Sequence, residues 1–203
     1  MNFDLIIVWW WASWLFCAIN APKDYKKLIL EKQNQLWTKI LLSWWWRCNF
    51  SNINTSPEKY FWQNKKILPS IFYKYSNQDF TDFLKKNDVE YQIEDNGRII
   101  LKNWKAKELL DLLIQKTVEN QTEIKVDQDI AKINKTENWF TIHTKDGMFT
   151  CKKLIMATWW ISFPQTGTIG FGIDLAKKFW IETIQCLPAL CWLETKTNFS
   201  ELS

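Results

Sequence analysis

The stretch that most constrains this chain is DLIIVWWWASWLFCAI, residues 4–19. It opens with a compact apolar run of β type and continues, from residue 12 to 21, with the composition of a helix that stops before Pro22. A secretory signal would carry basic residues ahead of the apolar run, and only Asp4 stands there. A membrane span needs about 18 consecutive apolar residues, more than Asp4 and Asn20 enclose. The tryptophans at the junction therefore need a local explanation.

Replacing each tryptophan of this stretch by glycine gives DLIIVGGGASGLFCAI, with a G-x-G-x-x-G pattern at positions 9, 11 and 14. The pattern lies between a strand and a helix, and Glu31 ends the next apolar run, residues 26–32. This is the context of a dinucleotide-binding fingerprint. Position 9 makes a tight turn, position 11 lets the backbone approach a pyrophosphate, and position 14 lets the helix pack close to the strand. A large side chain at position 14 is expected to push that helix away.

The composition fits the same exchange of residues. The chain has 15 tryptophans and 5 glycines, whereas ordinary usage of about 7% would give roughly 14 glycines. We hypothesise that the gene uses UGA for glycine and that the printed sequence translates it as tryptophan. The alternative is a genuine tryptophan-rich protein that uses its aromatic clusters at a membrane surface.

The remaining pattern alternates strands and helices at both ends of the chain, with antiparallel pieces between them. Helices are predicted near residues 66–75, 78–87, 106–119 and 173–179, with Asn103 as the N-cap of the third. Short strands flank a turn at Asn96-Gly97, and EIKVDQDIAKIN, WFTIHTK and MFTCKK are predicted to form a β-meander with a turn at Asp146-Gly147. A buried strand is expected at 153–158. The fold class is therefore α/β, with a parallel βαβ sheet and an antiparallel β-meander.

The charge distribution, the cysteines and the single histidine argue against several classes of function. The net charge of +4 is spread along the chain with no basic block, which argues against a nucleic-acid partner. The five cysteines form no CxxC pair, which favours reduced thiols in a cytoplasm and no metal site. His143 lies in the alternating FTIHT and is expected to be an ordinary strand residue.

With glycine restored, the chain resembles the BaiN/YhiN-like family of NAD(P)/FAD-dependent flavoproteins, which have two dinucleotide-binding domains. The resemblance rests on the fingerprint, TKILLSGGGRCNFSN, NGRIILKN, the ATGG strand end, SFPQTGTIGFG and CLPAL, in family order. It implies that residues 1–203 are the FAD-binding, N-terminal portion of a longer flavoprotein, without its substrate domain and C-terminal part. Ile100, Leu101, Ile169 and Phe171 depart from the family pattern. The last two weaken any substrate-side role of their loop.

The resemblance and the fingerprint together give a set of expected cofactor-binding residues. Glu31 is expected to accept hydrogen bonds from the adenosine ribose, Ile130 to meet the adenine through its backbone, and Arg47 to contact the flavin. The full set is Trp9, Trp11, Ala12, Ser13, Trp14, Glu31, Lys32, Lys39, Trp45, Arg47, Cys48, Asn49, Ile130, Ala157, Thr158, Trp159 and Trp160.

The resemblance implies an FAD-dependent oxidoreductase that moves a hydride between NAD(P)H and a small organic substrate. No catalytic acid or base can be assigned from these residues. Neither a nucleic-acid partner nor stable membrane insertion is expected. The alternatives are a non-catalytic dinucleotide-binding fragment or, if the tryptophans are genuine, a membrane-surface protein.

Overall fold

The computed structural model describes residues 1–8, 12–34, 49–60, 67–102, 106–158 and 170–185. Its larger sheet has six strands in the order β6-β2-β1-β9-β8-β7. Their bounds are β1 Asn2–Val8, β2 Lys27–Leu30, β6 Thr122–Lys125, β7 Ile130–Lys135, β8 Phe140–Thr144 and β9 Gly147–Met156. The first four strands in spatial order run parallel, and β9, β8 and β7 pair antiparallel. The predicted Rossmann-like α/β fold with an antiparallel meander is confirmed.

Two predicted strand assignments need correction. The segment containing residues 122–125 was expected to belong to the meander, but it forms β6 and pairs in parallel with β2. A helix, α5 (Ala106–Glu119), precedes it and supplies the long crossover that a parallel neighbour requires. MFTCKK and the strand expected at 153–158 are one continuous strand, β9, which pairs with both β1 and β8.

One face of the parallel sheet packs against α1 (Ala12–Asn20) and α5, which lie side by side. The helix side chains bury against strand residues such as Leu5, Ile7 and Ile29. The leucines of α5 are core residues, as their periodicity predicts: Leu109, Leu110, Leu112 and Leu113 are all buried. Burial of this apolar stripe stabilises the βαβ unit, at about 25 cal/mol per Å² of apolar area removed from water.

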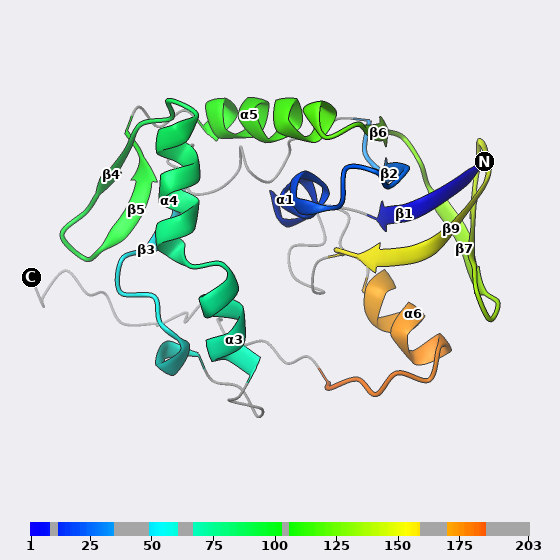
Figure 1. Cartoon of the computed structure of the whole chain (residues 1–203). Coiled ribbons are helices and arrows are strands. Elements are labelled where there is room, and N and C mark those ends of the chain that lie inside the picture. The colour runs from blue at the N-terminus through cyan, green and yellow to red at the C-terminus, as the bar shows by residue number, and fades with distance from the viewer. Residues whose placement is uncertain (9–11, 35–48, 61–66, 103–105, 159–169, 186–203) are drawn as a thin grey trace, which may run out of the picture.

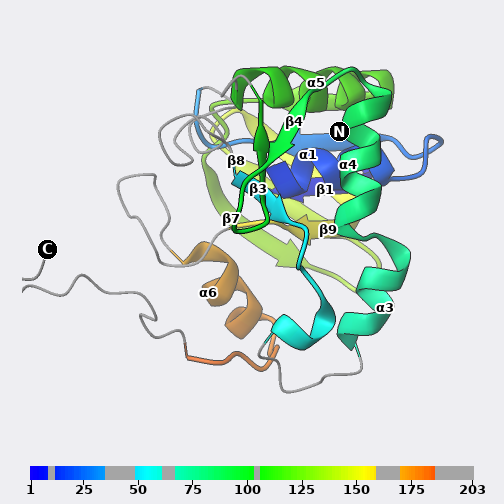
Figure 2. The same ribbon diagram turned by 90° about the vertical axis from the view of Figure 1, so that its left-hand side faces the viewer.

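The opposite face of the sheet is covered by the meander and by α6 (Phe171–Lys178). Figure 2 shows α5 and α6 on opposite sides of the sheet. Phe3, Ile6 and Leu28 of the parallel strands bury there against Ile142 of β8 and Leu175 of α6. Strands covered on both faces are expected to be apolar throughout, which explains why β1 and β2 show little alternation.

A second, three-stranded sheet has the order β3-β5-β4, with β3 Asn49–Asn52, β4 Tyr91–Ile93 and β5 Arg98–Leu101. The predicted turn at Asn96-Gly97 joins β4 to β5, and Gly97 has a φ of 79° that favours glycine. α4 (Asn77–Lys86) lies beside this sheet, and α3 (Ile67–Lys74) and the short 3₁₀ helix η1 (Pro57–Lys59) lie below α4 in Figure 1. Ser76 and Asp79 form a capping box at the start of α4.

Within the described ranges, no helix has both the length and the apolar character needed to cross a membrane.

The C-terminal end of α1 is held by an asparagine from a distant part of the chain. Asn120, directly after α5, is 5% exposed and donates its side-chain amide to the carbonyl oxygens of Ala18 (2.7 Å), Ile19 (3.1 Å) and Ala21 (3.0 Å). The last carbonyls of a helix have no partner within the helix, so they need such donors when they are buried. This bond set fixes the end of α1 against α5.

We predict that Asn120→Ala lowers the free energy of unfolding by about 1–3 kcal/mol, because it removes the side-chain donor from three buried or part-buried carbonyl oxygens. Asn20→Ala is the matched control. Asn20 is exposed, and its side-chain amide donates to the Phe16 carbonyl as its one partner among the described residues, so its removal should change stability by no more than about 0.5 kcal/mol. Denaturant titration of both variants measures the difference, and equal losses would contradict the capping role of Asn120.

Candidate functional site

The candidate site is the edge of the sheet where the parallel strands end. Val8 is in register with Leu30 of β2 and with Met156 of β9, and Leu30 is in register with Lys125 of β6. The carboxyl ends of four strands therefore form one row. In Figure 1 the arrows of β1 and β9 point toward the side of the molecule that carries the small sheet. Open α/β sheets bind ligands in the crevice at this edge.

The first residue after β2, Glu31, is a buried acid. It is 4% exposed, and its Oε1 accepts the backbone N–H of Gln33 at 2.8 Å. Its own N–H donates to the Lys125 carbonyl, and its carbonyl accepts the N–H of Gln128, both at 2.8 Å. A carboxylate offers about four acceptor positions, and the Gln33 N–H occupies one of those of Glu31.

Lys32 follows Glu31 directly, and Ile130 follows the connection whose Gln128 N–H binds the Glu31 carbonyl. Lys32 Nζ forms an ion pair with Asp129 Oδ1 at 3.1 Å. Ile130 is 6% exposed, begins β7 and packs in the core of the second face. The structure thus brings the residue expected at the ribose and the segment expected at the adenine to the same corner of the sheet.

The end of β9 forms the other side of the row. Ala157 donates its N–H to the Val8 carbonyl at 3.0 Å, which extends the parallel pairing beyond both strands. Thr158 lies against α6: a Cβ on Gly172 would collide with the Thr158 Oγ1. α6 begins after Gly170, whose φ is 71°. Gly172 therefore permits α6 to lie close to the end of β9. The sequence alone did not reveal this contact.

The remaining described candidates are distributed differently. Ala12 begins α1 and Ser13 is exposed in its first turn. Trp14 is 2% exposed and packs in the core with Leu5 and Leu15, while β1 and β2 keep their parallel register. The expected displacement of α1 by an indole at position 14 is therefore absent. Asn49 begins β3 in the small sheet, where it is exposed and pairs with Ile100.

Eight of the expected cofactor residues lie outside the described residues. They are Trp9, Trp11, Lys39, Trp45, Arg47, Cys48, Trp159 and Trp160. Asn103, the expected helix cap, also falls there.

The described thiols are unsuited to redox chemistry. Cys17 and Cys151 are both free. Burial raises the pKa of Cys17, and it raises the pKa of Cys151 to about 12. Because the thiolate is the reactive form, these raised pKa values disfavour the reactive state of both groups near neutral pH. His143 lies in β8, as predicted, with its Nε2 3.5 Å from the Asn134 amide. Among the described residues, no three His, Cys, Asp or Glu side chains gather in a way that could hold a metal ion.

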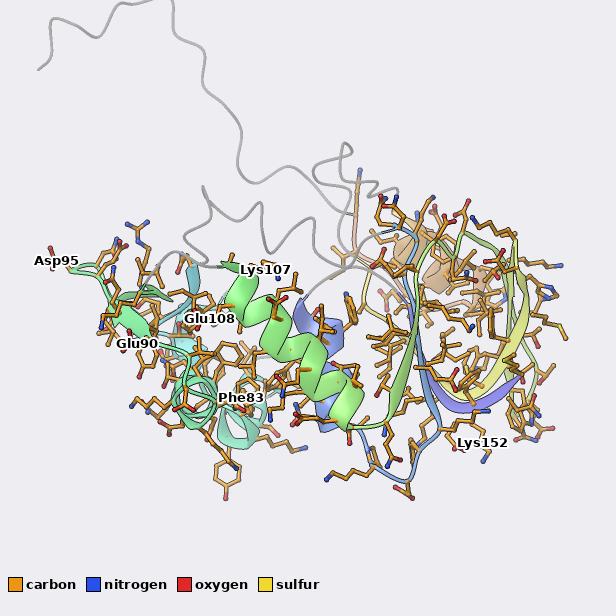
Figure 3. The ribbon with its side chains drawn as sticks, turned by 90° about the horizontal axis from the view of Figure 1, so that it is seen from above. Phe83, Glu90, Asp95, Lys107, Glu108 and Lys152 are labelled. Atoms are coloured by element: carbon orange, nitrogen blue, oxygen red, sulfur yellow. The ribbon has the colours of Figure 1, made fainter. Side chains whose placement is uncertain are left out.

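A surface ion pair between Lys152 and Asp4 lies away from the carboxyl ends of the parallel strands. Lys152 Nζ contacts Asp4 Oδ1 at 2.8 Å, and this hydrogen bond lowers the pKa of Asp4. Figure 3 shows Lys152 on the opposite side of the molecule from Glu90 and Asp95, which belong to the small-sheet region. The pair joins β9 to the amino half of β1, so it plays no part in the candidate site.

The family of the chain follows from a match over almost its whole length. Residues 3–187 fit the model of the HI0933-like protein Rossmann domain. The chain belongs to this family. The family agrees with the strand order and with the acid at the end of β2, both of which are typical of a dinucleotide-binding Rossmann domain.

Two curated relatives are named ribosomal RNA dihydrouridine synthase. The Escherichia coli (strain K12) protein is 26% identical over 184 residues, which are 90% of this chain and 46% of that protein. The Haemophilus influenzae protein is also 26% identical over 184 residues, which are 88% of this chain and 46% of that protein. The HI0933-like chain thus spans about half the length of the curated relatives it matches.

A solved structure shares the fold. The crystal structure of Thermovibrio ammonificans THI4 superposes with a TM-score of 0.53 at 11% sequence identity, and it covers 89% of this chain and 64% of that one. At this identity the likeness concerns the fold alone.

We predict that Gly172→Ala lowers the free energy of unfolding by about 1–3 kcal/mol, as overpacking usually does, because the new methyl group meets the Thr158 side chain. Thr158→Ala removes the colliding atoms. In a double-mutant cycle followed by thermal melts, Gly172→Ala should therefore cost much less in the Thr158→Ala background. Strictly additive effects would show that the two residues do not meet.

Proposed function

We propose that this chain binds FAD at the carboxyl edge of its parallel sheet, as part of an oxidoreductase that takes its electrons from NAD(P)H. The observation that carries the proposal is the position of Glu31: a buried acid at the end of β2, in the row formed by the ends of β1 and β9. When bound, FAD supplies the two-electron redox chemistry that protein side chains lack.

The described residues fit the adenosine and pyrophosphate parts of this cofactor. Glu31 can accept hydrogen bonds from ribose hydroxyls, because its carboxylate is held at the edge by the Gln33 N–H. α1 starts at the carboxyl end of β1, and the unpaired N–H groups and positive dipole end of a helix N-terminus bind phosphate. The segment that leads into Ile130 closes the adenine side of the corner. The roles of these residues are to bind and orient the cofactor.

The proposed substrate is a small organic molecule. A second candidate is a uracil base of ribosomal RNA, favoured by the names of the two curated relatives. Saturation of a uracil C5=C6 bond needs a hydride at one carbon and a proton at the other, so it belongs to the same class of flavin chemistry. We rank it second because the relatives are 26% identical and because the charges of this chain form no basic block.

The cofactor proposal predicts that the protein, produced with glycine at all 15 tryptophan positions, purifies with bound FAD. Glu31→Ala should then weaken FAD binding by about 1.5–3 kcal/mol for each charge-assisted hydrogen bond lost. Glu123→Ala is a matched control, since Glu123 is an exposed acid in β6. Flavin fluorescence titrations give the dissociation constants. An unchanged dissociation constant for Glu31→Ala would show that this residue does not bind FAD. A colourless protein that binds no flavin would contradict the FAD proposal and favour the alternative of a non-catalytic module.

Bleaching of the bound flavin by NADH or NADPH under anaerobic conditions tests the proposed reductant. Reoxidation by added ribosomal RNA, with a mass increase of two hydrogens in a uridine, would favour the second candidate over a small-molecule substrate.

We further propose that glycine is the residue intended at the tryptophan positions, through UGA codons translated as glycine. Trp180 supports this most directly. Trp180 directly follows Phe179, the C-cap residue of α6. The φ of Trp180 is 58°, and the residue is 96% exposed. Its N–H donates to the Lys177 carbonyl at 3.0 Å, while the Ile181 N–H donates to the Ala176 carbonyl at 2.9 Å. These two bonds define a Schellman motif, whose left-handed position is usually glycine.

The other described tryptophans differ from Trp180 in backbone conformation and packing. Four described non-glycine residues have a positive φ, namely Asp88, Gln121, Asp127 and Trp180, and Trp180 is the only aromatic residue of these four. Trp14 is accommodated in the core. Trp139 does not have a positive φ, and its ring lies 5.8 Å from Lys152 Nζ. The structural support for glycine therefore rests on position 180.

We predict that Trp180→Gly raises the free energy of unfolding by about 0.5–1 kcal/mol. Glycine relieves a left-handed penalty of about 1–2 kcal/mol, and its greater freedom in the unfolded chain takes back about 0.5–1 kcal/mol. Trp139→Gly is the control, because there glycine relieves no backbone strain and loses the contact with Lys152. It should leave stability unchanged or lower it. Thermal melts measure both changes.

The coding DNA gives an independent check. TGA is expected at codon 180 and at codons 9, 11, 14, 45, 159 and 160. TGG at these codons would refute the decoding proposal, and a stability gain in the Trp139→Gly control would show that the effect at position 180 is not specific to its backbone.

A further inference from the structure

The corner that holds Glu31 is closed by a short connection, residues 126–129, between β6 and β7. Two backbone hydrogen bonds join it to the turn after β2: Asp127 N–H to the Gln33 carbonyl at 2.9 Å, and Gln128 N–H to the Glu31 carbonyl at 2.8 Å. Asp127 has a φ of 57°, so the connection turns sharply at this point. The position of Glu31 therefore depends on how this connection is held.

The side chain of Gln128 holds it. It is 5% exposed, although glutamine usually lies at the surface. Its Oε1 accepts the Thr144 hydroxyl at 3.0 Å, and its Nε2 donates to Asp146 Oδ2 at 2.5 Å and to the Val126 carbonyl at 3.2 Å. Thr144 ends β8 and Asp146 lies in the turn before β9. One side chain thus ties the connection to the meander.

This bond set requires an amide. Asp146 needs a donor and Thr144 needs an acceptor, and a glutamine offers both at the end of one side chain. A glutamate in its place would bring a second carboxylate against Asp146 and lose the donor. A leucine would keep the volume, but it would lose the hydrogen bonds to Thr144 and Asp146 that tie the connection to the meander.

We infer that Gln128 is a positioning residue for the adenosine half of the bound cofactor, which rests on the FAD-binding function proposed above. Its effect on the ligand is indirect. Its backbone N–H binds the Glu31 carbonyl, and its side chain fixes the path of the chain from Asp127 into Ile130. The ligand class that it serves is an adenosine nucleotide, bound through its ribose and adenine.

The test compares Gln128→Leu and Gln128→Glu with Gln115→Leu in the glycine-restored protein. Gln115 is a matched control, because it is exposed on α5 and its side chain bonds, within the described part of the chain, to Glu119 alone. Flavin fluorescence gives the dissociation constant for FAD, and displacement by ADP reports the adenosine half alone. Both Gln128 variants should weaken FAD and ADP by about tenfold or more, as expected when hydrogen bonds that orient a binding group are lost, and the control should leave both unchanged.

A merely structural role would give a different result. If the variants melt at lower temperature but bind FAD and ADP with unchanged affinity, the inference is overturned. In a Glu31→Ala background the Gln128 variants should weaken ADP less than in the parent, since part of their effect passes through Glu31; full additivity would also contradict it.

Thr144→Val provides a second route should the Gln128 variants fail to fold, because it removes one partner of the amide and should weaken ADP in the same direction. Unchanged ADP binding in that variant would overturn the inference. A parent protein that binds neither FAD nor ADP would refute the proposed function itself, a result that no Gln128 variant can mimic.

Discussion

The candidate site depends on the register that β1 shares with its two parallel neighbours. Val8 is opposite both Leu30 and Met156, so three strands end at the same level. A shift of one residue in either pairing would turn a whole row of strand side chains to the wrong face. Both faces are apolar and covered, by α1 and α5 on one side and by the meander and α6 on the other. Burial on both faces therefore fixes the register, and the register fixes where Glu31 and Thr158 stand.

Polar contacts between elements that are far apart in sequence hold connecting segments at both ends of the parallel strands. Asn120 fixes the end of α1, and Gln128 joins the connection after β6 to the turn between β8 and β9. Each of these buried amides satisfies several partners at once. An apolar core positions elements to within the tolerance of side-chain packing, whereas hydrogen bonds of defined length and direction hold a loop in one conformation. A dinucleotide site needs the second kind of control, because its binding groups lie on turns.

The sequence predicts most elements here because their signals are local. The β1–α1 junction, the leucine stripe of α5 and the turn at Gly97 follow from residues that are neighbours along the chain. The partnership of β6 was predicted wrongly, since strand composition does not state which neighbour a strand will pair with. The roles of Gln128 and Gly172 were not foreseen for the same reason: each depends on a residue that only the fold brings close. A buried glutamine in a short connection between two strands leaves no periodic pattern that could identify it.

Positions 14 and 180 differ in whether the structure favours glycine. At position 14 the surrounding core has room for an indole, so packing alone does not demand glycine there. At position 180 the side chain is 96% exposed, so no neighbour can offset the strain of a left-handed backbone. A separate reason, the close approach of a phosphate to the backbone, is expected at fingerprint positions 9 and 11, which lie outside the described residues. Glycine at the end of α6 would therefore act on stability, and glycine in the fingerprint turn would act on cofactor affinity, so the two effects are separable within one chain.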